Sequence, residues 1–265
     1  MKTLTKLPLL LLALLLPESA ILSAEPIQLR VLSYNIHDGA GVDRKLDLER
    51  IAKVILSVKP DLVALQEVDR NVKRSRTVDQ PAELGRLTIM NVAFGENIEL
   101  QGGHYGNAIL SRFPIERFKN HLLPNVDDGE QRGVLVADID YPKLDSQIRL
   151  LSTHFDHRPN DRERVQSAEH INELVLKSKR PTLLMGDLND VISSDTLNKL
   201  DEVWKRTNDK PMPTIPVNIP SRQIDFILYQ PVEQWKVIET RVLDEDVASD
   251  HRAIFSVLEL HPAQE

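Results

Sequence analysis

The pattern of apolar and polar segments predicts an α/β fold, and within that class an α/β sandwich built on mixed β-sheets. Segments with strand periodicity alternate with segments of helical periodicity in parts of the chain, but several strand-like segments also follow one another directly. Consecutive parallel strands need a long crossover, usually a helix, whereas consecutive antiparallel strands need only a turn. The mixture therefore favours mixed sheets over an all-parallel, doubly wound sheet.

The first predicted elements lie in residues 28–65. Residues 28–34 alternate apolar and polar side chains, which is the period of a half-buried strand. The next segment predicts a helix, because Asp47 is a suitable N-cap and four apolar residues recur at helical spacing: Leu48, Ile51, Ile55 and Val58. Residues 59–61 include a proline that ends this helix, and the apolar residues 62–65 predict a short strand.

The rest of the chain supplies more strands than helices. Strands are predicted at residues 91–94, 104–111, 133–140, 148–154, 182–185, 223–229, 235–240 and 253–258, and a helix at residues 161–177. The proline-rich residues 211–216 predict an extended loop rather than a domain boundary. Because no repeat, low-complexity tract or long linker divides residues 25–265, we expect them to form a single domain.

Residues 1–24 have the pattern of a secretory signal peptide. A basic start precedes an apolar run at residues 7–16, and small residues follow it. A helix that spans a bilayer needs about 20 apolar residues, roughly twice this run. We expect cleavage after Ala24, with Ala20 as the alternative site, and export to the periplasm or the extracellular space. An uncleaved anchor or a buried helix is the competing interpretation.

The composition excludes several kinds of site. The 265 residues include no cysteine, which excludes disulfides, thiolate zinc sites, iron–sulfur clusters and cysteine nucleophiles. The formal net charge of −7 disfavours strong sequence-independent binding of nucleic acid, because that affinity comes mostly from Lys and Arg at phosphates. A nuclease that contacts few phosphates remains compatible with this charge.

Polar residues interrupt the apolar segments at the ends of several predicted strands. They are Asn35, Glu67, His154, Asp156, Asp187, Asn189, Asp225, Asp250 and His251. A lone carboxylate after a strand more often caps a turn or a helix than binds a ligand. A set of such residues indicates a site, because strand ends hold side chains from distant parts of the sequence together.

The residue types of this set favour a divalent cation with oxygen ligands. Carboxylate and amide oxygens suit Mg²⁺ first, with Mn²⁺ or Ca²⁺ as alternatives. Histidines near these carboxylates leave Zn²⁺ as a further alternative, although the chain has no HExxH motif. Neighbours on a strand point to opposite faces, so Asp250 need not contact His251. Asp225 or Asp187 is the alternative partner that would orient its imidazole.

Seven short segments together resemble the motifs of the endonuclease/exonuclease/phosphatase superfamily, in the order that family has. They are residues 33–35 (Ser-Tyr-Asn), 65–67 (Leu-Gln-Glu), 105–111 (Tyr-Gly-Asn-Ala-Ile-Leu-Ser), 152–154 (Ser-Thr-His), 186–189 (Gly-Asp-Leu-Asn), 224–226 (Ile-Asp-Phe) and 249–251 (Ser-Asp-His). The resemblance implies a DNase I-like, four-layer α/β sandwich, in which two mixed β-sheets are flanked by helices. It also implies Mg²⁺-assisted hydrolysis of a phosphoester.

The resemblance further implies a role for each matching residue. Glu67 would be the main metal ligand, with Asn35 beside it. Asp187 would position or deprotonate the attacking water, and Asn189 would hold the phosphate or the metal. The division of base and electrophile between Asp187 and His251 stays open.

The two matching histidines would contact the phosphoryl oxygens. His154 and His251 carry this role, and Asp225 or Asp250 would set the orientation of His251. The expected substrate-binding residues are Asn107, within the segment 105–111, and Arg158. One departure concerns His37, which stands where AP endonucleases of this superfamily carry an acidic residue, so a second metal ligand is in question.

The leading hypothesis is an exported, divalent-metal-dependent phosphodiesterase. A secreted nuclease of the same superfamily is the alternative, and a catalytically silent binding module is the alternative from another class. Basic residues at 70–76 would form either a rim that attracts an anionic substrate or a solvated loop. The expected partner is a phosphoester substrate, which is small, lipid-linked or a nucleic acid. We expect a monomer without an obligate protein partner.

Overall fold

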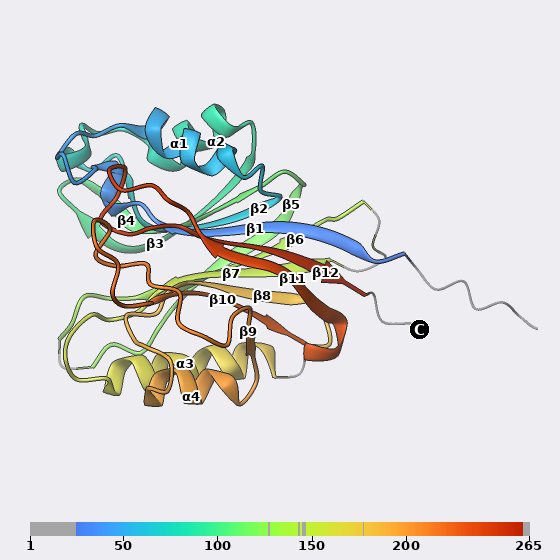
Figure 1. Cartoon of the computed structure of the whole chain (residues 1–265). Coiled ribbons are helices and arrows are strands. Elements are labelled where there is room, and N and C mark those ends of the chain that lie inside the picture. Colours follow the sequence, from blue (N-terminus) through green and yellow to red (C-terminus); the bar gives the residue numbers. More distant parts are fainter. Residues whose placement is uncertain (1–24, 127, 143, 145–146, 177, 262–265) are drawn as a thin grey trace, which may run out of the picture.

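Two six-stranded β-sheets pack face to face, and helices cover the outer face of each sheet (Figure 1). The computed structural model describes residues 25–126, 128–142, 144, 147–176 and 178–261, so the predicted signal peptide at residues 1–24 lies outside the described residues. The arrangement confirms the predicted four-layer α/β sandwich with two mixed sheets.

The first sheet has the strand order β11-β12-β1-β2-β4-β3. Its strands are β1 (Ile27–Asn35), β2 (Leu62–Arg70), β3 (Asn91–Leu100), β4 (Gly103–Ser111), β11 (Trp235–Val242) and β12 (Ile254–Leu260). Only β1 and β2 pair in parallel; the other neighbours are antiparallel. The helix α1 (Leu48–Ser57) supplies the crossover that a parallel pair requires.

The second sheet has the strand order β5-β6-β7-β8-β10-β9. Its strands are β5 (Ile115–Leu122), β6 (Gly133–Ile139), β7 (Ile148–His154), β8 (Thr182–Asp187), β9 (Lys205–Arg206) and β10 (Asp225–Gln230). Here β7 and β8 form the parallel pair, and the helix α3 (Arg162–Val175) connects them. Both sheets therefore combine one βαβ unit with antiparallel neighbours.

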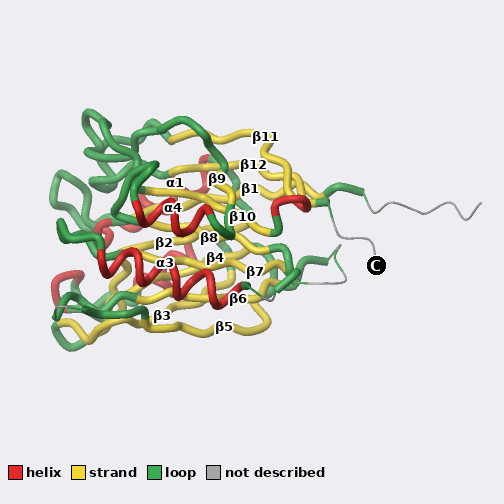
Figure 2. The backbone as a smooth tube through the Cα atoms, turned by 90° about the horizontal axis from the view of Figure 1, so that it is seen from below, coloured by secondary structure: helices red, strands yellow, loops and turns green. Residues whose placement is uncertain are grey.

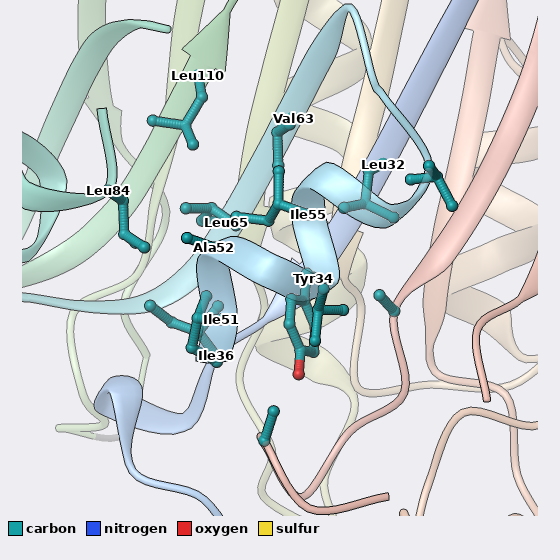
Figure 3. Packing of buried hydrophobic residues seen from close by; sticks show 14 of the residues in the cluster. Leu32, Tyr34, Ile36, Ile51, Ala52, Ile55, Val63, Leu65, Leu84 and Leu110 are labelled. Atoms are coloured by element: carbon teal, nitrogen blue, oxygen red, sulfur yellow. The ribbon is translucent and has the colours of Figure 1, made fainter. Parts of the chain in front are cut away.

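The helices close the two outer layers. Asp47 caps α1, since its side chain accepts a hydrogen bond from the Arg50 amide at 2.9 Å. Buried residues of α1 and of α2 (Gln80–Thr88), among them Ile51, Ile55 and Leu84, pack on the first sheet (Figure 3). The helices α3 and α4 (Asp195–Asp201) cover the second sheet in the same way. A third apolar cluster fills the space between the sheets.

Sequence periodicity located the central strands better than the peripheral elements. The predicted strand at residues 62–65 continues through polar residues to Arg70, and the strand at residues 91–94 continues to Leu100. The elements α2, α4, β5 and β9 were not predicted. Each is short or lies at the border of its sheet, so packing against the sandwich rather than its own apolar pattern defines it. None of the described helices is long and apolar enough to cross a bilayer.

The topology brings many strand ends to one end of the sandwich. The carboxyl ends of β1, β2, β7 and β8 meet there with the amino ends of β10 and β12, because the latter two run antiparallel to β8 and β1. This end lies opposite the carboxyl end of β12, and loops surround it (Figures 1 and 2). Most of the predicted site residues lie at this end.

Candidate active site

Three site residues stand side by side on the second sheet. His154, the last residue of β7, is the register partner of Asp187, the last residue of β8. Asp187 is in turn the register partner of Asp225, the first residue of β10. Side chains directly opposite each other on neighbouring strands point to the same face. The pairing of three strands therefore places one imidazole and two carboxylates in a row.

Asp187 is the centre of this arrangement. Its Oδ2 accepts a hydrogen bond from Asn35 Nδ2 at 3.1 Å and lies 3.5 Å from His154 Nε2 and 3.7 Å from His251 Nε2. Its Oδ1 accepts a hydrogen bond from the Asn189 amide at 2.9 Å. Asp187 and Asn35 are no more than 1% exposed. A carboxylate from one sheet and an amide from the other are thus joined away from solvent.

His251 is oriented by Asp225 rather than by its sequence neighbour Asp250. His251 Nδ1 lies 2.9 Å from Asp225 Oδ2, and the same oxygen accepts a hydrogen bond from Thr214 Oγ1 at 2.6 Å. Because Nδ1 faces a carboxylate, it carries a proton, and Nε2 is the nitrogen directed at Asp187. The geometry selects Asp225 among the partners that the sequence left open.

The two carboxylates and the imidazole shift each other's pKa. Burial lowers the pKa of His251, but the negative charges of Asp225 and Asp187 outweigh it and raise this pKa to about 10. Burial and the charge of Asp225 raise the pKa of Asp187 to about 7, against the opposing effect of His251. His251 is therefore a cation at neutral pH, and Asp187 is a stronger base than an ordinary aspartate.

Glu67 faces this group from the first sheet. Its Oε1 accepts a hydrogen bond from Asn35 Nδ2 at 2.9 Å, so Asn35 links Glu67 to Asp187. The strand register shifts between Leu65 and Val68, and Glu67 has a left-handed backbone with φ of 58°. Such a bulge redirects a side chain at the cost of local strain, a feature common at functional sites.

The surroundings of Glu67 fit a divalent cation. Burial is the main cause that raises its pKa, and the Asp250 carboxylate raises it further. A bound cation would relieve this crowding of negative charge, and the carboxylate of Glu67 with the side-chain oxygen of Asn35 offers the hard donors that Mg²⁺ prefers. Asp187, Asp225 and His251 also lie close enough to hold a metal, with ligand atoms within 4.8 Å of one another. In that group, however, Asp225 Oδ2 already serves His251 and Thr214.

The segment after β8 holds the Asp187 carboxylate in place. Asn189 has a left-handed backbone with φ of 50°, and its Nδ2 donates a hydrogen bond to the Phe155 carbonyl oxygen at 3.0 Å. A Cβ atom on Gly186 would overlap the Thr153 carbonyl oxygen of the neighbouring strand. The glycine and the asparagine of the Gly-Asp-Leu-Asn segment are thus required by the local backbone.

The two residues predicted to bind substrate, Asn107 and Arg158, make defined contacts within the protein. Asn107 is fully buried, and its Nδ2 donates a hydrogen bond to the Gly133 carbonyl oxygen at 3.0 Å, which ties β4 to β6. Arg158 forms ion pairs with Asp156 at 3.0 Å and Glu163 at 2.7 Å. These partners lie outside the group formed by Asn35, Asp187 and His251, and the role of both residues in binding substrate stays a prediction.

The basic segment after Glu67 is partly neutralised. Arg70 pairs with Glu96 at 2.7 Å, and Arg74 pairs with Asp69 at 2.8 Å and with Asp38 at 3.3 Å. Arg70 and Arg74, two of the residues predicted to form a basic rim, are therefore paired with carboxylates of the protein.

Sequence reasoning missed two residues of the site. Thr214 lies in the proline-rich loop, where nothing in the local pattern distinguishes it. Arg132 stands directly before β6, and its Nη1 lies 3.2 Å from His154 Nδ1. The rule that polar residues at strand ends form the site, applied to strand beginnings as well, would have found Arg132.

The chain is similar to known proteins over most of its length. The model of the Endonuclease/Exonuclease/phosphatase family matches residues 32–251. The uncharacterized protein YbhP of Escherichia coli K12 is 32% identical over 213 residues, which are 75% of this chain and 83% of YbhP.

Solved structures show the same fold. An endonuclease/exonuclease/phosphatase structure from Beutenbergia cavernae is 26% identical with a TM-score of 0.77, over 89% of this chain and 72% of that one. A structure of the same description from Bacteroides vulgatus is 20% identical with a TM-score of 0.72, over 88% of this chain and 99% of that one. On the family match and the arrangement of its strand ends, this chain belongs to the endonuclease/exonuclease/phosphatase family.

Proposed function

We propose that this chain is an exported, divalent-metal-dependent phosphodiesterase that attacks phosphorus with water. Its family consists of phosphoester hydrolases that depend on a divalent metal. One observation carries the proposal: Asn35 bridges Glu67 and Asp187, so the candidate metal ligand and the candidate base belong to one buried, hydrogen-bonded set. Export rests on the pattern of residues 1–24 alone.

Glu67 and Asn35 are the residues that would hold the cation, with Mg²⁺ as the first candidate. A divalent cation supplies charge that polarises the phosphoryl group and stabilises the leaving oxygen. Asn35 serves a second purpose in this arrangement, because its amide nitrogen bonds both carboxylates and keeps them apart in a fixed geometry.

Asp187 and His251 divide the proton chemistry between them. The raised pKa of Asp187 suits a base that takes a proton from the attacking water near neutral pH. His251 stays protonated and directs Nε2–H at a phosphoryl oxygen, where negative charge accumulates. Asp225 holds the imidazole in this orientation through Nδ1. These assignments make Asp187 the base and His251 the electrophile.

The charge distribution favours a small or lipid-linked phosphodiester over nucleic acid. The net charge of −7 and the ion pairs of Arg70 and Arg74 leave few free cations next to Glu67 for a run of phosphates. A nuclease is the second candidate within the family. A silent binding module is disfavoured because a chain without catalysis has no need to keep Asp187, Asp225 and His251 buried together, and burying charged groups costs free energy even where they pair.

A panel of substrates tests the proposal. Bis-p-nitrophenyl phosphate, p-nitrophenyl phosphate, plasmid DNA and sphingomyelin are each incubated with Mg²⁺, Mn²⁺ or EDTA, in parallel with the Asp187→Asn variant. We expect the diester to be cleaved with metal, EDTA to abolish cleavage, and Asp187→Asn to lose it. Preference for plasmid DNA would favour the nuclease, and no cleavage of any substrate would favour the binding module.

A further inference from the structure

Arg132 makes an unusual set of contacts beside the candidate active site. Its side chain is only 4% exposed, and Nη1 pairs with Glu130 Oε1 at 2.8 Å. The same Nη1 lies 3.2 Å from His154 Nδ1, and Nη2 lies 3.3 Å from His157 Nδ1. One guanidinium therefore contacts the Nδ1 atom of His154 and the Nδ1 atom of His157.

These contacts determine which nitrogen of each ring carries the proton. A guanidinium has five N–H donors and no acceptor, so a histidine nitrogen bonded to it must accept. The neutral form of each imidazole then carries its proton on Nε2. For His154, burial is the main cause of a pKa well below the ordinary value, and the charge of Arg132 lowers it further. His154 is thus a neutral Nε2–H donor.

This tautomer is the one that a phosphoester requires. Non-bridging phosphoryl oxygens only accept hydrogen bonds, so an imidazole helps only when it presents N–H, and a lone pair in that position repels the anion. His154 directs Nε2 toward the carboxylate of Asp187, at the centre of the site. His157 is exposed three residues further along the chain.

Folding alone does not explain the position of Arg132. Burying a guanidinium is costly, and its partner Glu130 is 38% exposed, which weakens the compensating attraction. Its Nε has no hydrogen-bond partner among the described residues. An apolar side chain of similar volume at such a place is often neutral or stabilising.

We propose that Arg132 is a positioning residue that holds His154 and His157 as Nε2–H donors, and that His157 forms a second contact to the phosphoryl oxygens. The role in catalysis rests on the proposed function, whereas the tautomers do not. Two imidazoles set by one guanidinium would act as a pair, and each would stabilise a different oxygen of the reacting phosphate.

Nitrogen NMR of the full chain tests the tautomers without any substrate. Long-range proton–nitrogen correlation spectra distinguish protonated from unprotonated ring nitrogens, and His154→Gln and His157→Gln assign the signals. We expect both rings to have Nδ1 unprotonated and Nε2 protonated. Arg132→Met should release both rings into mixed tautomers, whereas Arg206→Gln, which removes a partly buried guanidinium paired with Asp201, should leave them unchanged. A protonated Nδ1 in wild-type His154 overturns the proposal.

Kinetics on bis-p-nitrophenyl phosphate then test the positioning role. We expect Arg132→Met to lower kcat about 10- to 100-fold, the usual effect of removing a residue that orients an active-site group. Arg132→Lys keeps the charge but has one nitrogen for two rings, so it should recover only part of kcat. Full recovery of kcat by Arg132→Lys would show that a positive charge is sufficient for activity, and would overturn the role of the two guanidinium nitrogens.

A double-mutant cycle tests the contact by His157. Arg132→Met and His157→Ala should not be additive in kcat/KM, because each removes the same donor. Additive losses would overturn the pairing. If Arg132→Met does not fold by circular dichroism, Arg132→Gln replaces it, since its amide can reach only one ring. A chain with the expected tautomers but no hydrolytic activity would refute the proposed function and leave the assignment of the tautomers supported.

Discussion

Asp187 shows how single contacts give a common side chain an uncommon property. The pKa of an aspartate in water lies far below neutral pH. Burial and the neighbouring Asp225 nevertheless raise the pKa of Asp187 to about 7. The contacts from Asn35 and the Asn189 amide keep its oxygens directed at the site. The carboxylates of Asp225 and Asp187 also raise the pKa of His251 and keep its imidazole protonated. The surroundings thus make Asp187 the candidate base and keep His251 as the candidate proton donor.

Replacing His251 should affect catalysis more than binding. His251→Ala is expected to lower kcat about 100-fold with little change in KM, because the imidazolium stabilises charge that develops only in the transition state. Steady-state kinetics on bis-p-nitrophenyl phosphate measure this, and circular dichroism verifies folding. His261→Ala, at an exposed position directly after β12, is the matched control. A folded His251→Ala chain with wild-type kcat would remove His251 from the mechanism.

Replacing Glu67 should abolish the effect of metal on stability. Saturating Mg²⁺ is expected to raise the Tm of the wild-type chain, because a ligand of the native state adds about 2.7 kcal/mol at 100 times its Kd. Glu67→Ala should show no such rise, whereas Glu99→Ala, an exposed position on β3, should respond as wild type does. Thermal unfolding with and without Mg²⁺ decides. An equal response of Glu67→Ala and wild type would show that Glu67 is not the ligand.

One carboxylate joins β5, β6, β7 and the segment before β8 in the second sheet. Asp138 on β6 is 3% exposed and pairs with Arg117 on β5 at 2.6 Å, Arg149 on β7 at 2.8 Å and Arg180 before β8 at 2.7 Å. Burial alone would raise the pKa of Asp138, but these three arginines outweigh it and hold this pKa well below its ordinary value. The cluster fixes four consecutive segments of the sheet to each other.

Asp138→Asn should destabilise the fold in a pH-dependent way. We expect a loss of about 2–3 kcal/mol in the free energy of unfolding at neutral pH, the size of lost hydrogen bonds to a charged group. The stabilisation by a carboxylate with a lowered pKa is complete above its unfolded value of about 3.9 and disappears as pH falls toward the folded value. Urea unfolding across this range should show the difference between variant and wild type shrinking on acidification.

The control for this prediction is a carboxylate two residues further along the chain. Asp140→Asn, at an exposed position, should change the unfolding free energy little at any pH. If Asp138→Asn were as stable as wild type at neutral pH, the three arginines would be surface pairs without energetic weight.

In the whole molecule, the polar site lies where the carboxyl ends of β1, β2, β7 and β8 meet, and loops surround this end of the sandwich (Figure 2). We expect the chain to be a monomer in solution, and light scattering measures its molecular mass.

The proposed signal peptide gives a prediction about the N-terminus of the mature chain. If the chain is exported as we propose, the mature protein should begin near Glu25, because the apolar run at residues 7–16 is too short to anchor a chain in a bilayer. Sequencing the N-terminus of the protein from the exported fraction measures this. Recovery of Met1 in that fraction would defeat the prediction, and a start near Ile21 would favour the alternative cleavage site.

The sequence by itself determined the sandwich, its central strands and most members of the site. Apolar periodicity is a local property, and the polar residues at strand ends, from Asn35 to His251, interrupt it visibly. The order of the motifs was enough to name the family, which the family match then showed. The sequence did not predict α2, α4, β5 and β9, because short or half-exposed segments carry little periodic signal.

Only the tertiary structure decided how the site residues are paired. The register of β7, β8 and β10 placed His154, Asp187 and Asp225 in one row, and it made Asp225 the partner of His251. Strand register and the bulge at Glu67 depend on contacts between residues far apart in the chain, so no local pattern encodes them. The proposed role of Arg132 likewise follows from the tertiary structure, because the fold brings two histidines more than twenty residues away to its guanidinium.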